Sequence, residues 1–514
     1  MKNSYLKFIF VCWILLFVQS QLIHAFSPKR EFRGVWLQTV NRSEIKKMTP
    51  AQLRGYFIYM LDEFEKLGFN AIVFQARPKA DAFYDSAYEP WSDMLTGTQG
   101  KPPYPLWDPM AFLIQECHKR NMEFHAWINP YRVTYAGNNN LHSSHIYHRH
   151  PDWFIRYDGN IYFDPGVPES REHICNVVND IVTRYDIDAI HLDDYFYPYP
   201  KAGVTFSDQA SFAKYGKPQG YYPNRIADWR RNNVNLLVRD IKTTITNANK
   251  PWVKFGISPF GIYRNWASTS NGTGSNTNGL QCYDDLFADV LCWTHYKWID
   301  YLAPQLYWEI GNKSADYATL VHWWSKQDLG NTHLYIGQDI ERCLPTQKNP
   351  AVRKDQLARK MNIGRRMPTV GGNCFWYGYG ILDNLGGIKD SLMNYHHYPA
   401  LIPSLAHLPK ELVKKEPNKP SKLKAERTPQ GYKLTWEAKR GKTVAENPVY
   451  FCIYRFEKNE KENLSDASKI VKITRDTEYQ LPYYSGRTQY KYVITSVNRF
   501  HHENSSGKKI NVKL

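Results

Sequence analysis

The sequence Asp188-Ala-Ile-His-Leu-Asp-Asp-Tyr-Phe-Tyr-Pro198 begins as a buried strand, but it carries ionisable side chains where a simple core would carry aliphatic ones. His191 and Asp193 are two positions apart, and alternate residues of a strand point to the same side. Asp194 follows at once. A central strand that directs two ionisable groups to one side is more typical of a functional site than of a hydrophobic wall.

Seven further segments have the character of strands, and helical segments separate them. Between Thr49 and Gly68, for example, apolar residues recur at helical spacing, and a strand follows directly. Eight strands that alternate with helices predict an α/β fold, a closed (β/α)8 TIM barrel over residues 30–405 with its active site at the carboxyl ends of the strands. An open doubly wound sheet is the alternative, although no glycine-rich phosphate loop follows the first strand. The seven segments cover residues 31–40, 71–77, 123–129, 254–260, 301–308, 333–339 and 372–377.

The first 25 residues differ from the barrel. Lys2 and Lys7 precede an apolar run from Phe8 to Val18, which is too short to span a bilayer comfortably. This order predicts a cleaved export signal over residues 1–25, with an uncleaved N-terminal anchor as the alternative. No later apolar segment is long enough for a membrane span, so we expect an exported protein in the periplasm or at the cell surface.

The C-terminal part of the chain also differs. Residues 406–420 are rich in Lys, Glu and Pro, which predicts a linker. Residues 421–514 contain short alternating segments separated by turns, with Trp436 in an early segment and a Tyr-rich late segment over 490–496. They predict a small all-β sandwich that resembles a fibronectin type III module and has no catalytic constellation of its own.

Composition narrows the range of partners. The formal net charge of +17 favours an anionic surface such as a cell-wall polymer, or nucleic acid. Export favours the wall, and no nucleic-acid motif accompanies the charge. The eight Cys form no Cys-x-x-Cys pair, which argues against a disulfide framework or a zinc cluster. Aromatic residues make up 15% of the chain, and they could stack on sugar rings or fill a large core. We therefore expect a polysaccharide partner, no metal and no cofactor.

Carboxyl groups near strand ends are the candidate catalytic groups. Hydrolysis of a glycosidic bond needs one carboxyl to protonate the leaving oxygen and another to attack the sugar or activate water. We expect Asp193 to be the nucleophile or base, and Asp194 to be the partner acid, an orienting group or only a turn cap. Glu309 is the expected second carboxylate, with Asp339 and Glu89 as competitors.

Polar and aromatic residues near the strand ends are the candidate substrate-binding groups. Donors such as Arg77 and Arg132 would bind hydroxyl, acetamido or carboxylate groups, and His191 could hold the Asp193 carboxylate by a hydrogen bond. Trp91 is a further candidate for stacking, and a place in the core is the alternative for each Trp. The expected set is Arg77, Asn129, Tyr131, Arg132, His191, Gln305, Tyr307, Trp308 and Trp376.

Five ordered motifs carry a resemblance to a known family. They are Phe32-Arg-Gly-Val-Trp36, Phe74-Gln-Ala-Arg-Pro78, Trp127-Ile-Asn-Pro-Tyr-Arg132, His191-Leu-Asp-Asp-Tyr-Phe-Tyr-Pro198 and Ala303-Pro-Gln-Leu-Tyr-Trp308. Over about residues 30–400 the chain resembles the bacterial glycosyl-hydrolase-like TIM-barrel family once catalogued as a domain of unknown function. That family includes the divisome-localised glycosidase of peptidoglycan glycans stripped of their stem peptides. The resemblance implies an exported barrel hydrolase of a glycan, often followed by a fibronectin-like module, and it favours peptidoglycan glycan strands as substrate.

Two other functions stay open. An Asp pair with clustered histidines such as His142 and His145 is typical of metal-dependent polysaccharide deacetylases, although there the Asp pair lies on the first strand and the histidines follow it. Dependence on zinc would separate deacetylation from hydrolysis. The other alternative is a barrel that binds glycan without cutting it, because the sequence does not single out the second carboxylate.

Overall fold

The computed structural model describes residues 27–405, 408, 412, 415–482 and 488–514. The expected export signal lies outside the described residues, as does part of the expected linker. In the part of the chain that the structure describes, no helix has both the length and the apolar character needed to cross a membrane.

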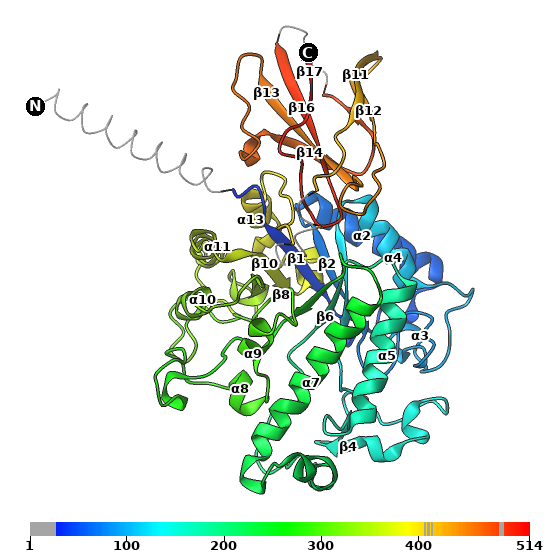
Figure 1. Cartoon of the computed structure of the whole chain (residues 1–514), viewed down its shortest axis with the longest axis vertical. Helices are drawn as coiled ribbons and strands as arrows, with labels where there is room; N and C mark the ends of the chain where they lie inside the picture. The colour runs from blue at the N-terminus through cyan, green and yellow to red at the C-terminus, as the bar shows by residue number, and fades with distance from the viewer. Residues whose placement is uncertain (1–26, 406–407, 409–411, 413–414, 483–487) are drawn as a thin grey trace, which may run out of the picture.

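Eight parallel strands close into a barrel, which confirms the predicted fold class (Figure 1). Around the ring the order is β1, β10, β9, β8, β7, β6, β3 and β2. Each strand therefore pairs with its neighbours in the ring and none is left as a free edge. The strands are β1 (Phe32–Leu37), β2 (Ala71–Arg77), β3 (Glu123–Ile128), β6 (Ala189–Leu192), β7 (Lys254–Ile257), β8 (Tyr301–Leu302), β9 (His333–Asp339) and β10 (Val370–Trp376).

Strand β8 is much shorter than the predicted segment 301–308. Pro304 follows it closely, and proline has no N–H for the ladder. Beyond this break only Gln305 makes isolated bridges, to Phe260 on one side and Gly337 on the other. Leu306 N–H still donates to the Gly337 carbonyl of β9 at 3.1 Å, but residues 306–309 form no strand or bridge, so the alternation of a strand does not apply to Glu309.

Helices cover the outside of the ring (Figure 1). The first, α2 (Pro50–Lys66), begins with a capping box in which the Thr49 side chain accepts from Gln52 N–H and the Gln52 side chain accepts from Thr49 N–H. Gly68, at φ +73°, ends the turn that follows it. The other long helices are α4 (Pro109–Lys119), α5 (Pro168–Arg184), α7 (Ile226–Asn247), α10 (Tyr317–Ser325), α11 (Gln356–Arg366) and α13 (Ile388–Tyr395).

One predicted helix is divided, and shorter elements fill the connections. The helical segment 283–296, which separates the predicted strands 254–260 and 301–308, forms two pieces because Phe287 adopts a left-handed conformation, φ 54°, and Asp289 caps a new helix by accepting from Cys292 N–H. These pieces are α8 (Cys282–Asp285) and α9 (Val290–His295). The remaining short elements of the barrel are α3 (Asp93–Thr96), the hairpin β4 (Phe154–Tyr157) and β5 (Asn160–Phe163), α6 (Gln209–Ser211) and α12 (Gly378–Leu382).

The C-terminal module is all-β, as predicted. One sheet has the order β11, β12, β15, and the other has the order β14, β13, β16, β17. Trp436 from the first sheet and Phe451 and Tyr492 from the second pack in a common core. The likeness to fibronectin type III stays a prediction. The strands are β11 (Ser421–Thr428), β12 (Gly431–Glu437), β13 (Tyr450–Glu457), β14 (Ile470–Thr474), β15 (Glu478–Gln480), β16 (Gln489–Val497) and β17 (Lys508–Lys513).

The module docks on the end of the barrel where the strands begin (Figure 1). Asn121, just before β3, donates to the Ile473 carbonyl at 3.1 Å. His501 of the module lies 2.6 Å from the carboxylate of Glu123, the first residue of β3. At the opposite end of the barrel, where the strands finish, loops surround the strand ends.

Candidate functional site

A cavity of about 400 Å³ lies at the carboxyl ends of the barrel strands. This is where parallel α/β barrels place their active sites. Six of the predicted site residues line it, and they come from the end of β10 and from segments that follow β3, β6 and β8. The lining consists of Trp36, Gln38, Val40, Asn41, Gln75, Trp127, Arg132, Tyr135, Asp193, Asp194, Tyr195, Tyr199, Ser258, Phe260, Gln305, Tyr307 and Trp376.

Asp193 is buried and fixed by donors from the neighbouring strand β3. Trp127 Nε1 donates to its carboxylate at 3.0 Å, and Asn129 Nδ2 donates to both carboxylate oxygens at 3.0 and 3.1 Å. Burial raises the pKa of Asp193, while the charge of Arg132 and these donors act in the opposite direction. Its orientation is therefore set before any ligand arrives.

Asp194 has different partners. Gln305 Nε2 donates to one carboxyl oxygen at 2.9 Å, and the Tyr199 hydroxyl donates to the other. Burial and the adjacent charge of Asp193 raise the pKa of Asp194 to about 6. Asp194 therefore keeps its proton near pH 5. The donors around the neighbouring Asp193 favour its ionised form.

Two predicted residues lie just beneath the cavity lining. Asn129 acts through Asp193, because its amide holds that carboxylate. His191 does not hold Asp193. Its Nε2 lies 3.1 Å from Trp36 Nε1 and 3.0 Å from the Ser258 hydroxyl, both of which line the cavity.

His191 is part of a buried chain of hydrogen bonds along the barrel axis. The Trp36 indole N–H can only donate, so His191 Nε2 accepts and its Nδ1 carries the proton. Nδ1 then donates to the Tyr301 hydroxyl at 2.8 Å, which donates to His125 Nδ1 at 2.8 Å. His125 Nε2 donates to Glu123 at 2.9 Å. One set of tautomers therefore satisfies the whole chain from the cavity floor to the docked module.

Four predicted residues do not line the cavity. Arg77 is fully buried, donates to Glu89 from Nε at 2.7 Å and from Nη2 at 2.6 Å, and also donates to the Asn129 and Pro130 carbonyls. Tyr131 is buried in the main core, and Trp308 packs against Phe260 with ring centroids 5.5 Å apart. Glu309 lies outside the cavity lining, where its carbonyl accepts from two backbone N–H groups.

The competing carboxylates are engaged elsewhere. Glu89 forms the buried ion pair with Arg77, and this charge together with His173 lowers the pKa of Glu89 to about 2 despite burial. Asp339 caps a short 3-10 turn by accepting from Glu341 N–H at 3.0 Å. Neither lines the cavity, nor does the stacking candidate Trp91.

Several lining residues were not predicted as site residues, among them Trp36, Asn41, Tyr135, Tyr195 and Tyr199. The sequence carries a signal for two of them, because Tyr195 and Tyr199 follow the acidic pair closely in the chain; their rings stack with centroids 5.1 Å apart. Arg132 lies over the Tyr195 ring at 4.6 Å and extends this aromatic wall. Asn41 and Tyr135 come from loops, where the alternation of strands gives no guidance.

The described residues contain no group of three or more His, Cys, Asp or Glu side chains placed to hold a metal ion. Of the clustered histidines, His145 caps a short turn by accepting from Tyr147 N–H, and burial lowers its pKa to about 4. His142 bonds to Ser144 at 2.9 Å. The deacetylase alternative therefore finds no ligand set in the part of the chain that the structure describes.

Comparison with known proteins gives consistent matches. A sequence model of the family described as glycosyl hydrolase-like 10 matches residues 31–353. Glycosyl hydrolase YngK of Bacillus subtilis (strain 168) is 40% identical over 492 residues, which cover 93% of each chain. Glycosyl hydrolase DigH of Escherichia coli (strain K12) is 36% identical over 326 residues, 59% of this chain and 72% of that protein. The PgaB (BpsB) glycoside hydrolase domain from Bordetella bronchiseptica superposes with a TM-score of 0.48 at 12% identity, covering 70% of this chain and 98% of that domain, a resemblance too distant to indicate a function.

Proposed function

Because the chain belongs to the glycosyl hydrolase-like 10 family, we propose that it is an exported glycoside hydrolase that cleaves a cell-wall polysaccharide, with peptidoglycan glycan strands as its substrate. The observation that carries this proposal is the pair Asp193 and Asp194, two carboxyl groups with different partners in one cavity at the carboxyl ends of the strands. The predicted export signal and the net charge of +17 support a place in the periplasm or at the cell surface and association with an anionic wall.

Asp194 is the proposed general acid. A carboxyl with a pKa of about 6 holds its proton in mildly acidic solution, where it can give that proton to the leaving glycosidic oxygen. The Tyr199 hydroxyl and Gln305 amide orient it. These contacts orient Asp194, whereas burial and the adjacent charge of Asp193 favour its neutral form.

Asp193 is the proposed anionic partner. Among the described residues that line the cavity, Asp193 and Asp194 are the two carboxylic acids, and they are consecutive in the chain. Two neighbouring residues are poorly placed to act from opposite faces of a sugar, as a direct displacement requires. A 2-acetamido group of the substrate can supply the nucleophile instead. Its carbonyl oxygen attacks the anomeric carbon while the glycosidic bond breaks and Asp194 protonates the leaving oxygen, and Asp193 accepts from the acetamido N–H. Water then displaces the carbonyl oxygen from the anomeric carbon and returns a proton to Asp194. This route fits peptidoglycan, whose sugars carry that group.

The rest of the lining suits a sugar. Trp376 and Tyr307 offer apolar ring faces, and Arg132 and Asn41 offer hydrogen-bond donors. A cavity of about 400 Å³ lies within the range of roughly 300–1,000 Å³ that is typical of small-molecule sites. A few sugar units of a longer chain could therefore be held here at a time.

The test is incubation with denuded and with peptide-bearing peptidoglycan, followed by mass analysis of the released fragments. We expect new reducing ends with the wild-type protein and none with a double Asp193→Asn, Asp194→Asn variant. Glycan retained intact by the wild-type protein would instead favour a binding barrel. Release of acetate that a chelator abolishes and zinc restores would favour deacetylation.

A further inference from the structure

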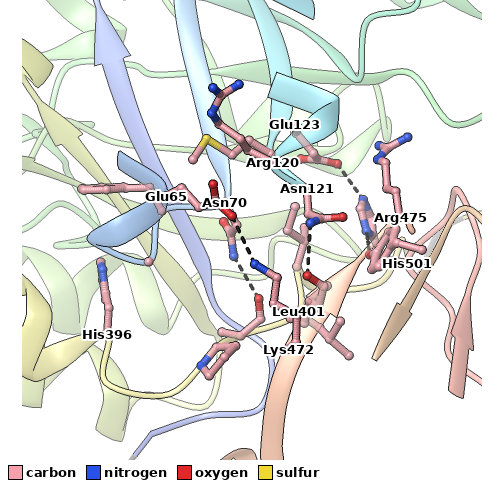
Figure 2. Close-up of a pocket in the computed structure, with 18 of the residues that line it drawn as sticks. Glu65, Asn70, Arg120, Asn121, Glu123, His396, Leu401, Lys472, Arg475 and His501 are labelled. Carbon is pink, nitrogen blue, oxygen red and sulfur yellow. Dashed lines mark hydrogen bonds and ion pairs between the residues drawn. The ribbon is translucent and has the colours of Figure 1, made fainter. Parts of the chain in front are cut away.

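A second cavity, of about 280 Å³, lies at the other end of the barrel, between the barrel and the C-terminal module (Figure 2). Figure 2 shows Arg120, Asn121 and Glu123 on the barrel side and Arg475 and His501 on the module side. Both domains therefore contribute walls, and the cavity exists only while the module is docked.

The carboxylates that line this cavity are already occupied. Glu65 pairs with Lys472 at 3.3 Å. Asp188 bonds to His118 at 2.8 Å and to the backbone N–H of Phe124 at 2.9 Å. Glu123 contacts Lys254, His125 and His501. None of the three is left to neutralise a further cation.

The lining cations are also paired, with one exception. Lys66, Arg120, Lys472 and Arg499 each form an ion pair with a carboxylate. Among the described residues Arg475 has no hydrogen-bond or ion-pair partner, and its Nε is buried without an acceptor. Burial and the charge of Arg499 lower the pKa of Arg475, while the nearby charge of Asp188 acts in the opposite direction without forming an ion pair with it.

The lining contains five Lys or Arg side chains and three Asp or Glu side chains. Because carboxylates inside or outside the lining pair with the other four cations, Arg475 is the lining cation that is left to receive an anion. The Arg475 side chain is partly buried, and its fork of N–H groups, which matches the oxygens of a carboxylate or phosphate, has no acceptor among the described residues. An anion that entered the cavity would therefore meet a donor with no competing internal acceptor.

We propose that this cavity binds a small oxyanion, a carboxylate or a phosphate, through Arg475 at the joint between the barrel and the module. The volume of about 280 Å³ admits an inorganic anion or a short organic acid. Because the walls come from both domains, the bound anion stabilises the docked arrangement. This site is distinct from the catalytic cavity and does not depend on hydrolase activity.

The experiment is calorimetric titration of the full chain with inorganic phosphate and, separately, with acetate, at constant ionic strength maintained with chloride. We expect at least one of the two oxyanions to bind with a dissociation constant in the millimolar range or tighter, and to raise the melting temperature by about 1 °C at saturating concentrations. The comparison between phosphate and acetate identifies the kind of oxyanion.

Three variants connect the binding to Arg475. Arg475→Met should weaken binding at least about tenfold, and Arg475→Lys, which keeps the charge but loses the fork, should weaken it less. Arg427→Met, an exposed residue of the same module outside the cavity lining, should bind as the wild type does. Absence of binding to the wild-type chain, or unchanged binding by folded Arg475→Met or Arg475→Lys, overturns the proposal.

Discussion

Replacement of Asp194 by asparagine removes the proposed acid while it keeps the size of the side chain. The new side chain retains an oxygen that can accept from Gln305, and its amide can donate to the oxygen of Tyr199, so both present contacts have a substitute. We therefore expect the variant to fold like the wild type. The change then isolates the proton that Asp194 is proposed to deliver.

The size of the effect follows from the pKa of about 6 and from the leaving group. General acid catalysis contributes about 10²–10⁴-fold, so hydrolysis of a natural glycan should fall by a factor in that range. An aryl glycoside with an acidic phenol needs little protonation and should lose less than about tenfold. In the wild type the rate should fall about tenfold per pH unit above pH 6, because deprotonation of Asp194 removes the acid. The variant should lack this alkaline fall.

The assay is kcat/KM for both substrates between pH 4 and pH 8, with circular dichroism to verify folding. A matched control is Asp339→Asn, which removes a partly buried carboxyl outside the cavity lining whose pKa is also raised to about 6. Near-native hydrolysis of the natural glycan by Asp194→Asn, or an alkaline fall identical to that of the wild type, would refute the assignment of Asp194 as the acid.

Four further predictions follow from the same geometry. Asp193→Asn should fold normally yet lose at least about a hundredfold in turnover, and near-native turnover would remove Asp193 from the mechanism. Glu89→Gln should lower the free energy of unfolding by about 3–5 kcal/mol in denaturant titration, because it leaves Arg77 buried without its counter-ion, and unchanged stability would contradict this. Tyr301→Phe interrupts the axial chain below the cavity, so kcat should fall about tenfold while KM stays unchanged, and an unaltered kcat would show that the chain does not position the cavity floor. Glu309→Gln should keep turnover within about twofold of the wild type, whereas a hundredfold loss would restore Glu309 as the partner carboxylate.

The ring and its acidic centre could be predicted because they depend on local patterns. Each strand and helix of the barrel has its own periodicity, and a repeated strand–helix order has few ways to close. Asp193 and Asp194 stand directly after such a strand, so their place at the rim follows from the fold. The polar partners of Asp193, Trp127 on β3 and Asn129 directly after it, obey the same alternation.

Other predicted residues lie outside the cavity lining because the chain leaves regular structure near them. Strand alternation over 301–309 places Glu309 at the cavity, but β8 ends at Leu302 and Pro304 lacks the N–H that the ladder would use. Arg77 is the last residue of its strand, but a long loop brings Glu89 next to it, and the two side chains form a buried ion pair. The charge of Arg77 is therefore neutralised within the protein. Which loop residue meets which strand end is decided by tertiary packing, and that information is not contained in the spacing of one segment.

The C-terminal module docks where the barrel strands begin, at the end of the barrel opposite to the cavity that holds Asp193 and Asp194. Leu514 belongs to the module, so the carboxyl terminus points away from the mouth that would receive the polymer (Figure 1). A tag or fusion partner added there would lie on the side of the protein opposite to that cavity. Beads that hold the protein by this tag would leave the opening of the cavity facing the material to be digested.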